Sequence, residues 1–289
     1  MSDRPRPDTA PGPAAAMRIV HLSDLHFTAR PGRLTAAFDK RLLGRLNYLL
    51  RRRGTLHEEW FDLAVPRIAA LTPDCLVCSG DVTCVGSPAE FARARARLET
   101  LMQAVPVPLL YVPGNHDAYV ADRDCRAALA DTFRFLNGRR CRLEQMPFAL
   151  RLGNVSFLML NECTPTGPFS SAGQISPAAA EALTGWLSAP RPPAERRVLI
   201  GHYPTRGPDA APLPRRRRLG SAGLIIEALA QGRLDLSLCG HLHSPYRLDG
   251  PGPGMEVCAG ALTAAGSLSV VDIAGDGRLS QRFLDLRPA

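Results

Sequence analysis

Five short polar segments hold most of the side chains in this sequence that could bind metal ions. They are Asp24-Leu25-His26, Gly80-Asp81, Gly114-Asn115-His116-Asp117, Gly201-His202 and Gly240-His241-Leu242-His243. Five of the seven histidines in the chain lie in these segments. The segments offer carboxylate, amide and imidazole groups but no thiolate, a ligand set that suits hard or borderline divalent ions. Their order along the chain predicts one binuclear metal site.

A short apolar run precedes each segment and predicts a β-strand. The runs are Arg18–Leu22, Cys75–Cys78, Pro108–Val112, Arg197–Ile200 and Leu234–Cys239. Because side chains at the carboxyl ends of several strands converge on one rim of an α/β fold, we expect the segments to meet. In four of the segments a glycine precedes the ligand, where it permits a sharp turn and a close approach of the backbone to an ion.

The ordered set, with Asn-His-Asp in the middle and His-x-His last, resembles the calcineurin-like metallophosphoesterase superfamily. The resemblance extends from Met17 to the C-terminus. It implies an α/β fold, a four-layer α-β-β-α sandwich in which two mixed β-sheets are flanked by helices. Within the superfamily, the layout is most similar to class III cyclic-nucleotide phosphodiesterases. A related alternative is the group of UDP-diacylglucosamine hydrolases, some of which carry Arg where this chain has His116.

The same resemblance implies seven metal ligands shared by two divalent ions. One ion would be bound by Asp24, His26 and His243, the other by Asn115, His202 and His241, and both would be bridged by Asp81. Mn²⁺ or iron is expected ahead of Zn²⁺. Two ions about 3.5–4 Å apart can share a hydroxide and clamp a phosphoryl group. Neutral imidazoles and an amide complete the ligand set without cancelling the positive charge that stabilises the transition state.

The resemblance leaves His116 without a metal and implies that it contacts the phosphate and the leaving group. A histidine beside Asn115 on the same tight turn is placed to protonate a leaving oxygen, a role that suits a pKa near neutrality. Many members of the superfamily carry an acidic or amide residue three positions after the bridging aspartate, where it can orient this histidine. Cys84 occupies that position here. We expect Asp117 to do part of that job, which makes it the second candidate catalytic residue.

The composition indicates a single domain. The chain has 289 residues, of which 45% are hydrophobic, enough for one sizeable core. Residues 1–16 are rich in Pro, Ala and polar groups and contain no apolar stretch of a secretory signal, so we expect a disordered tail, or a true start at Met17. Residues 17–289 are expected to form the catalytic domain. No stretch reaches the length of a membrane span.

The eight cysteines do not suggest a disulfide framework. Cys75-x-x-Cys78 lies within an apolar run, and no second cysteine pair or Cys-His set completes a metal site, so we interpret it as part of a buried strand. A redox or metal role is the alternative. Reduced thiols and the lack of a signal indicate a cytoplasmic location.

Capping and turn residues predict further elements. Helices are expected from Ser87-Pro88 to about Gln103, from Ser176-Pro177 to about Leu187, over Ser221–Gln231, and over Thr55–Leu71 with a kink or break at Pro66. Two hairpins are expected, Phe148–Leu152 with Val155–Leu160 and Ser267–Ile273 with Leu279–Leu286.

Two basic segments have alternative interpretations. Phe38–Arg53, in an insertion at about residues 36–54, predicts an amphipathic helix whose leucine face is flanked by cations. Such a helix can pack on the domain or over the site, or it can lie on an anionic membrane. Arg215–Arg218, which follows His202, is either a solvated loop or a contact for a substrate phosphate.

The leading interpretation is a metal-dependent phosphoesterase that hydrolyses a phosphodiester or pyrophosphate bond by attack of a metal-bridged hydroxide. Its partner would be a phosphate-containing small molecule, or a lipid-linked nucleotide such as UDP-diacylglucosamine met at the inner face of the membrane. A nuclease of the same fold agrees with the net charge of +8, but aromatic residues make up only 6% of the chain and argue against nucleic acid. A non-catalytic scaffold predicts lost ligands, and none is lost.

Overall fold

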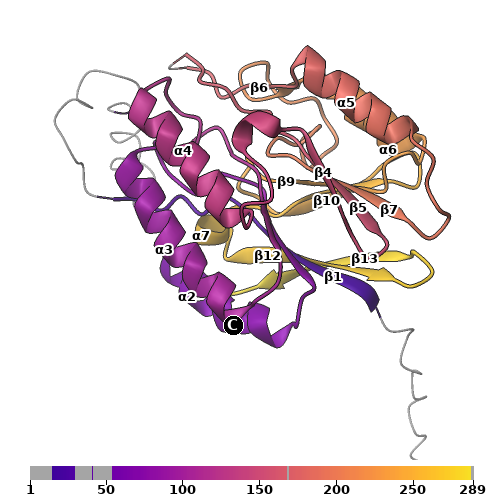
Figure 1. Ribbon diagram of the computed structural model, residues 1–289, viewed down its shortest axis with the longest axis horizontal. Coiled ribbons are helices and arrows are strands. Elements are labelled where there is room, and N and C mark those ends of the chain that lie inside the picture. Colours follow the sequence, from indigo (N-terminus) through magenta and orange to yellow (C-terminus); the bar gives the residue numbers. More distant parts are fainter. Residues whose placement is uncertain (1–14, 30–40, 42–53, 168, 288–289) are drawn as a thin grey trace, which may run out of the picture.

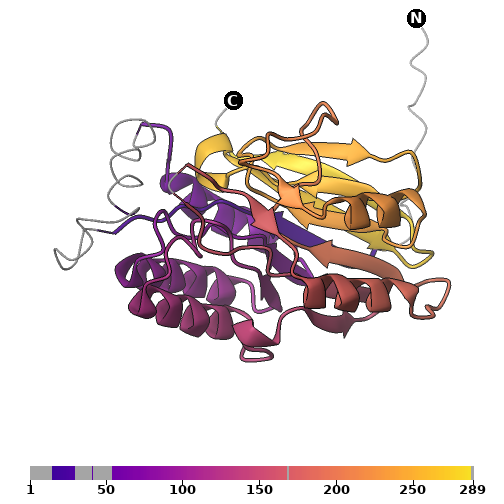
Figure 2. The same cartoon turned by 90° about the horizontal axis from the view of Figure 1, so that it is seen from above.

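The computed structural model describes residues 15–29, 41, 54–167 and 169–287. Within this part of the chain, two large mixed sheets lie face to face and helices cover the outer side of each (Figure 1). The view from above shows the same arrangement, with the purple and magenta helices on one side and the orange helices on the other (Figure 2). The expected four-layer α-β-β-α sandwich is therefore confirmed.

The first sheet has five strands in the order β13-β12-β1-β2-β3. Their bounds are Leu279–Asp285 (β13), Ser267–Ala274 (β12), Ala15–Leu22 (β1), Cys75–Cys78 (β2) and Leu109–Tyr111 (β3). The neighbours β1, β2 and β3 run parallel, whereas the C-terminal hairpin β12–β13 joins β1 in antiparallel pairing. The outer face is covered by α2 (Glu59–Ala70), α3 (Pro88–Ala104) and α4 (Arg123–Leu136).

The second sheet has six strands in the order β10-β11-β9-β7-β5-β4. Their bounds are Tyr246–Asp249 (β10), Met255–Cys258 (β11), Leu236–Cys239 (β9), Arg196–Ile200 (β7), Val155–Met159 (β5) and Phe148–Leu152 (β4). The four central strands are parallel and the two edge strands antiparallel. The helices α5 (Pro177–Ser188) and α6 (Gly223–Ala230) cover this sheet.

Short elements complete the described chain. They are the 3-10 helix η3 (Leu143–Gln145), the helix α7 (Leu262–Ala265) and a two-stranded parallel sheet of β6 (Gly173–Gln174) and β8 (Leu219–Gly220). The small β6–β8 sheet joins the loop after β5 to the loop after β7. Both hairpins that the sequence predicts are present, β4–β5 and β12–β13.

The strands of the second sheet alternate between two apolar cores. On β7, Val198 and Ile200 belong to the large core between the two sheets, whereas Leu199 belongs to the core beneath α5 and α6. On β5, Phe157 and Leu158 divide in the same way. Since successive side chains of a strand point to opposite faces, a continuous apolar run is what a strand buried on both faces requires. These buried layers hold the strand ends rigidly.

The helix signals that the sequence carries are confirmed with small shifts of the ends. Ser87 caps α3 by accepting the Glu90 amide at 3.4 Å, with Pro88 as the first helical residue, and Ser176 caps α5 in the same way at 3.2 Å. The helix does not break at Pro66, because α2 runs through that residue without interruption, and the alternative of a kink stays a prediction. Because α2 packs Phe61 and other apolar residues into the core, burial outweighs the hydrogen bond that proline removes.

The sequence analysis does not identify the long helix α4 or the short helix α7. α4 begins after Asp122, whose Oδ1 accepts the Cys125 amide at 3.0 Å. Its buried positions include Leu129, Phe133 and Leu136, which share one face at spacings of four and three residues. The signal was thus present, but charged residues between these positions obscured it.

The first described strand overlaps the predicted N-terminal tail. β1 begins at Ala15 and pairs it with Ala274, so the last two residues of the predicted tail, 15 and 16, belong to a strand. Residues 1–14, 30–40 and 42–53 lie outside the described residues, and so does the leucine face of the basic segment. Arg41 is described and is buried against α4, where it donates to Cys125 Sγ at 3.2 Å.

The states of the cysteines and the lengths of the helices test the predictions about disulfides and membrane spans. All eight cysteines are buried and free, and burial raises the pKa of Cys75 to about 12. The interpretation of Cys75-x-x-Cys78 as part of a buried strand is confirmed, since both residues lie in β2. None of the described helices is long and apolar enough to cross a membrane. The cytoplasmic location stays a prediction.

Candidate metal centre

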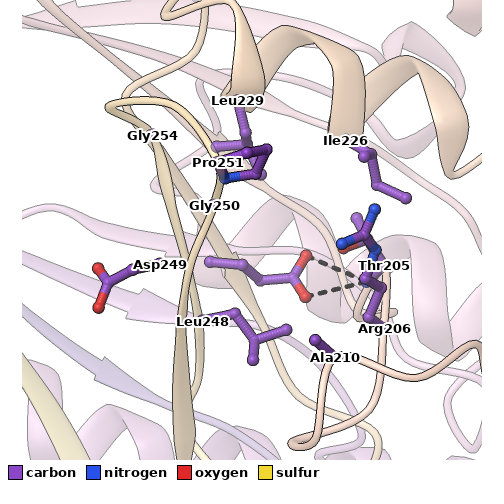
Figure 3. Close-up of a pocket in the computed structure, with 11 residues that line it drawn as sticks. Thr205, Arg206, Ala210, Ile226, Leu229, Leu248, Asp249, Gly250, Pro251 and Gly254 are labelled. Atoms are coloured by element: carbon purple, nitrogen blue, oxygen red, sulfur yellow. Dashed lines mark hydrogen bonds between the residues drawn. The ribbon is translucent and has the colours of Figure 1, made fainter.

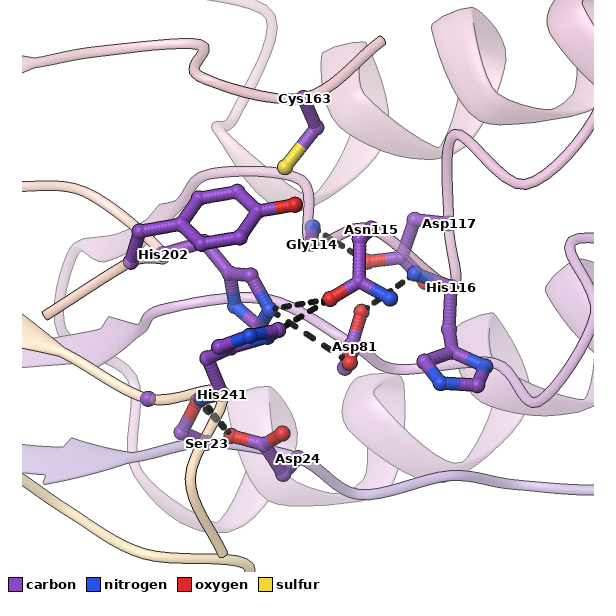
Figure 4. A network of polar contacts seen from close by, with 12 residues as sticks. Ser23, Asp24, Asp81, Gly114, Asn115, His116, Asp117, Cys163, His202 and His241 are labelled. Carbon is purple, nitrogen blue, oxygen red and sulfur yellow. Dashed lines mark hydrogen bonds and ion pairs between the residues drawn. The ribbon is translucent and has the colours of Figure 1, made fainter. Parts of the chain in front are cut away.

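The five polar segments lie in turns that follow the carboxyl ends of β1, β2, β3, β7 and β9, and their side chains converge between the two sheets (Figure 4). Three of these strands belong to the first sheet and two to the second. The site is therefore assembled across the sandwich rather than along one sheet. Every sequence-predicted residue of the site is among the described residues.

Asp24, His26 and His243 form a group whose ligand atoms all lie within 4.8 Å of one another. Asp24 Oδ1 lies 3.6 Å from His26 Nε2 and 3.3 Å from His243 Nε2, and the two Nε2 atoms are 2.9 Å apart. His26 Nδ1 lies 3.2 Å from the Thr83 carbonyl, to which it donates a proton in the tautomer that leaves a lone pair on Nε2. Lone pairs thus point toward one another, the arrangement that a cation satisfies.

A buried oxygen supports the same conclusion. Asp24 Oδ2 accepts hydrogen bonds from Ser23 Oγ at 2.7 Å and from the His241 amide at 3.0 Å. Asp24 Oδ1 is buried and accepts no hydrogen bond from any described residue. An unsatisfied buried carboxylate oxygen is costly, so the residues present fit a metal ion at this position.

Asn115, His202 and His241 converge in the same way. Asn115 Oδ1 lies 3.2 Å from His202 Nε2 and 2.8 Å from His241 Nδ1. Each imidazole is held by its other nitrogen: His202 Nδ1 donates to the Ser79 carbonyl at 2.7 Å, and His241 Nε2 donates to the Arg217 carbonyl at 3.1 Å. Backbone carbonyls commonly orient metal-binding histidines in this way. The three inward-facing atoms fit a second cation.

Asp81 lies between the two groups. Its Oδ2 is 4.0 Å from His26 Nε2 in the first group and 3.5 Å from His202 Nε2 in the second. Its Oδ1 accepts the His116 amide at 2.7 Å. A carboxylate in this position can contribute to both ions, which is the bridging role that the sequence predicts.

The pKa shifts of Asp81 and His202 show that the centre has a negative electrostatic potential. Burial disfavours the charged form of both, but the positive rings of His202 and His116 keep the pKa of Asp81 below its ordinary value. In return, Asp81 outweighs the effect of burial on His202 and raises the pKa of that ring to about 10. A divalent ion satisfies the same negative potential more fully than a proton does.

The backbone is strained at the same residues. Among the described residues, nine non-glycine positions have positive φ, and five of them are candidate ligands: Asp24 (53°), His26 (48°), Asp81 (54°), His241 (71°) and His243 (62°). A left-handed backbone costs an L-residue roughly 1–2 kcal/mol. Such strain persists where the surrounding structure enforces it, and it gathers at functional sites. The turns thus hold these side chains in directions that ordinary strand or helix backbone does not provide.

Two glycines make the turns possible. Gly80 has φ of 105°, and a Cβ there would collide with the backbone of Gly114 and with His202 Nδ1. A Cβ at Gly240 would collide with the side chains of Ser23 and Asp24. The expectation that glycine allows close approach beside the ligands is therefore confirmed at these positions.

Residues 17–245, which are most of the chain, match the calcineurin-like phosphoesterase family. The chain belongs to this family. The resemblance inferred from the ordered motifs is thereby confirmed, and membership of this family of phosphoric ester hydrolases accounts for a donor set that fits two divalent metal ions.

Proteins of several activities are similar to this chain in sequence or in fold. Glycerophosphodiester phosphodiesterase GpdQ of Enterobacter lignolyticus is 30% identical over 106 residues, which are 35% of this chain and 30% of that protein. A dimetal phosphatase from Danio rerio has a similar fold, with a TM-score of 0.64 and 12% identity over 94% of this chain and 97% of that one. A purple acid phosphatase from yellow lupin seeds gives a TM-score of 0.61 and 12% identity over 93% of this chain and 51% of that one.

In this member of the calcineurin-like phosphoesterase family, His116 is oriented by a backbone group. Its Nδ1 donates to the Cys84 carbonyl at 2.5 Å, and its ring stacks on Tyr119 with centroids 5.3 Å apart. Cys84, the residue that departs from the usual pattern, therefore supplies the orienting acceptor through its main chain. The His116 ring also meets His26 edge to face at 5.0 Å, which places it beside the first ligand group.

Asp117, the second candidate catalytic residue, is hydrogen-bonded within the turns beside the candidate ligands. Its buried carboxylate accepts from Tyr111 Oη at 2.8 Å, from the Thr83 amide at 3.0 Å and from the Gly114 amide at 3.0 Å. These bonds tie the turns after β2 and β3 together. Within the described chain, its hydrogen bonds do not include the His116 ring. Burial, together with Asp81, raises the pKa of Asp117 to about 6.

Sequence reasoning missed Glu162. This buried residue follows β5, and its Oε2 accepts the amides of His202 at 2.8 Å and Tyr203 at 2.9 Å, which fixes the turn that carries the ligand. Burial raises the pKa of Glu162 to about 7. The available signal was an acidic residue directly after an apolar strand, the same signal that marks Asp24 and Asp81.

A cavity of about 280 Å³ opens onto these residues. Its walls combine the candidate ligands with a few residues from neighbouring loops: Asp81, Asn115, His116, Ser171, Arg217, His241, Leu242 and His243. Arg217 belongs to the basic segment Arg215–Arg218, so the interpretation of this segment as a contact near the site is favoured for one of its four residues.

A second, smaller pocket of about 50 Å³ lies beside the turn that follows His202 (Figure 3). Glu256 on β11 is buried there, and its two oxygens accept the Thr205 amide at 3.1 and 3.0 Å. Burial raises the pKa of Glu256 to about 7, despite the opposing effect of the backbone donors. This carboxyl group holds the loop in place, and it belongs to neither of the metal-binding groups found among the described residues.

The raised pKa of Glu256 predicts that its contribution to the stability of the fold depends on pH. Because the folded pKa of about 7 exceeds the ordinary value of 4.5, the protonated form favours folding below pH 4.5, and this stability is lost as pH rises through 7. The free energy of unfolding of the wild type, minus that of Glu256→Gln, should fall by about 3 kcal/mol between pH 4 and pH 8. Urea unfolding of both proteins at matched pH measures it. A difference that stays constant with pH would contradict the assignment.

Proposed function

We propose that this protein is a phosphodiesterase that uses two divalent metal ions to hydrolyse a small phosphate ester. The observation that carries the proposal is Asp81, whose carboxylate lies between two groups of inward-facing ligand atoms at the wall of a cavity that also holds His116. The proposed ligands are the seven residues of the two groups: Asp24, His26, His243, Asn115, His202, His241 and the shared Asp81. We propose Mn²⁺ or iron as the resident metal.

When bound, the two ions would polarise the phosphoryl group and lower the pKa of water at the site. The protein's own residues do the rest. Asp81 accepts the His116 amide at 2.7 Å, so the residue between the ligand groups also fixes the turn that carries the acid. The Cys84 carbonyl accepts a hydrogen bond from Nδ1 of His116, which fixes the orientation of the ring. Proton transfer to the leaving oxygen is therefore assigned to Nε2 of the same ring.

A phosphodiester is favoured by two considerations. The relative GpdQ carries the name of a glycerophosphodiester phosphodiesterase, and its similarity to this chain extends over 30% of its length. In addition, a general acid is most useful where the leaving group is poor, as is the alkoxide of a phosphate ester compared with the phosphate of an anhydride. Lipid-linked pyrophosphates stay an alternative, because the segment that would meet the lipid lies largely outside the described residues.

One panel of substrates tests the proposal. Purified full-length protein, supplied with Mn²⁺, would be assayed on bis-p-nitrophenyl phosphate, cyclic nucleotides, UDP-diacylglucosamine and single-stranded DNA, with a chelator-treated sample as control. We expect metal-dependent release of p-nitrophenol from the diester and loss of this activity in the chelated sample. Full metal occupancy without hydrolysis of any ester would overturn the proposal. Hydrolysis confined to UDP-diacylglucosamine or to DNA would replace the substrate class.

A further inference from the structure

The basic segment Arg215–Arg218 is held in place by its main chain. The Arg216 carbonyl accepts the Ser171 amide at 2.8 Å, and the Arg218 carbonyl accepts the Gly173 amide at 3.1 Å, where the β6–β8 sheet begins. The Arg217 amide donates to the Pro214 carbonyl at 2.8 Å. The backbone of this segment is therefore ordered by hydrogen bonds on both sides, although its four side chains are exposed.

The carbonyl of Arg217 has a different partner from those of its neighbours. It accepts His241 Nε2 at 3.1 Å, and His241 Nδ1 faces Asn115 in the candidate metal centre. Residues 215–217 form a turn, in which the Arg217 amide donates to the Pro214 carbonyl, so the carbonyls of this segment have different partners. The main chain of Arg217 thus lies directly behind a candidate ligand, and its distance from the centre is fixed.

Arg217 lines the 280 Å³ cavity, whereas Arg215, Arg216 and Arg218 do not. Apart from the histidines, Arg217 is the one cationic residue among the described residues of this cavity wall. Its guanidinium forms no ion pair with any carboxylate of the described chain, unlike Arg191, which lies 2.5 Å from Asp235. A guanidinium offers a planar fork of donors that matches phosphate or carboxylate oxygens.

We propose that Arg217 binds a second anionic group of the substrate, adjacent to the phosphoryl group at the metal centre. The inference rests on the proposed function. It adds a substrate class to that function: phosphate esters or anhydrides that carry a further phosphate or carboxylate next to the reacting group. Arg217 acts here as a specificity residue, and its carbonyl separately orients His241.

The test compares three small ligands that share one phosphonate. Methylphosphonate has no second anionic group, phosphonoacetate adds a carboxylate, and methylenediphosphonate adds a second phosphonate. Isothermal titration calorimetry on the Mn²⁺-loaded full chain gives the dissociation constant of each ligand for the wild type, Arg217→Ala, Arg217→Lys and the matched control Arg216→Ala. Manganese content is measured before and after each titration, because the diphosphonate binds metal ions in solution.

The wild type should bind the doubly anionic ligands more tightly than methylphosphonate. Loss of a charge-assisted hydrogen bond is worth about 1.5–3 kcal/mol, so Arg217→Ala should weaken their binding about 10- to 100-fold and change that of methylphosphonate less than about threefold. Arg217→Lys should fall between, since it keeps the charge and loses the fork. Whichever ligand responds more, carboxylate or phosphonate, identifies the second group. Manganese content should match the wild type, because the substitution keeps the carbonyl that orients His241.

Two outcomes overturn the inference. One is an unchanged preference for the doubly anionic ligands in Arg217→Ala, and the other is an equal loss in Arg216→Ala, which would show a diffuse charge effect. Turnover of bis-p-nitrophenyl phosphate by the same samples separates this test from that of the proposed function. Normal turnover with an unchanged preference refutes the role of Arg217 alone. Absent turnover with a lost preference refutes the phosphoesterase proposal and leaves an anion site at Arg217.

Discussion

Asp81→Asn is expected to release both metal ions and to abolish turnover. Asp81 lies near both ligand groups, 4.0 Å from His26 Nε2 and 3.5 Å from His202 Nε2. The substitution keeps the size of the side chain and an oxygen that can accept the His116 amide, but it removes the negative charge that the two ions share. Since bound ions supply several kcal/mol of transition-state stabilisation, activity should fall by at least about 10³-fold.

Elemental analysis of the metal-supplied protein provides the measurement. The wild type should contain about two equivalents of metal, the number that a binuclear site holds. His243→Ala is the informative comparison, because it removes a ligand of one group and should leave the other ion bound. Asp272→Asn, which loses the same charge at an ion pair with Arg18 outside the site, should keep full content. A wild type that never exceeds one equivalent would overturn the binuclear assignment, as would an Asp81→Asn protein that keeps both ions.

His116→Ala should separate metal binding from chemistry. His116 lines the cavity, but the groups of candidate metal ligands are formed by other residues. We therefore expect metal content equal to that of the wild type and a fall in kcat of about 10²–10⁴, the range for loss of a general acid. The His116 amide, which bonds Asp81, is retained in the variant, so the turn should keep its conformation.

A series of aryl and alkyl diesters distinguishes an acid from a binding residue. The loss of rate in His116→Ala should be small for p-nitrophenol as leaving group, larger for phenol and largest for an alkyl alcohol, since poorer leaving groups depend more on protonation. His57→Ala, at a histidine that bonds Glu59 away from the cavity, serves as control and should match the wild type. An equal loss along the series would show that His116 binds the transition state without transferring a proton.

Local signals explain why so much of the fold was predictable. Ser87 and Ser176 cap helices, and the glycines before the ligands permit turns, because each effect depends on residues within a few positions of one another. The order of strands in the sheets does not depend on such signals. β1 lies between β12 and β2. Its pairing with β12 joins residues more than two hundred positions apart, such as Ile19 and Val271. The pairing is decided by burial over the whole domain.

The sequence by itself predicted the candidate ligand set of the centre, because carboxylate, amide and imidazole groups in this order carry their chemistry wherever the chain places them. The tertiary structure alone decided how those groups are held. The Cys84 carbonyl orients His116, the Arg217 carbonyl orients His241, and Asp117 ties two turns together. Every residue has a carbonyl, so residue identity gives no sign of which carbonyl will face a histidine. That depends on where distant segments meet, and only the packed sandwich brings them together.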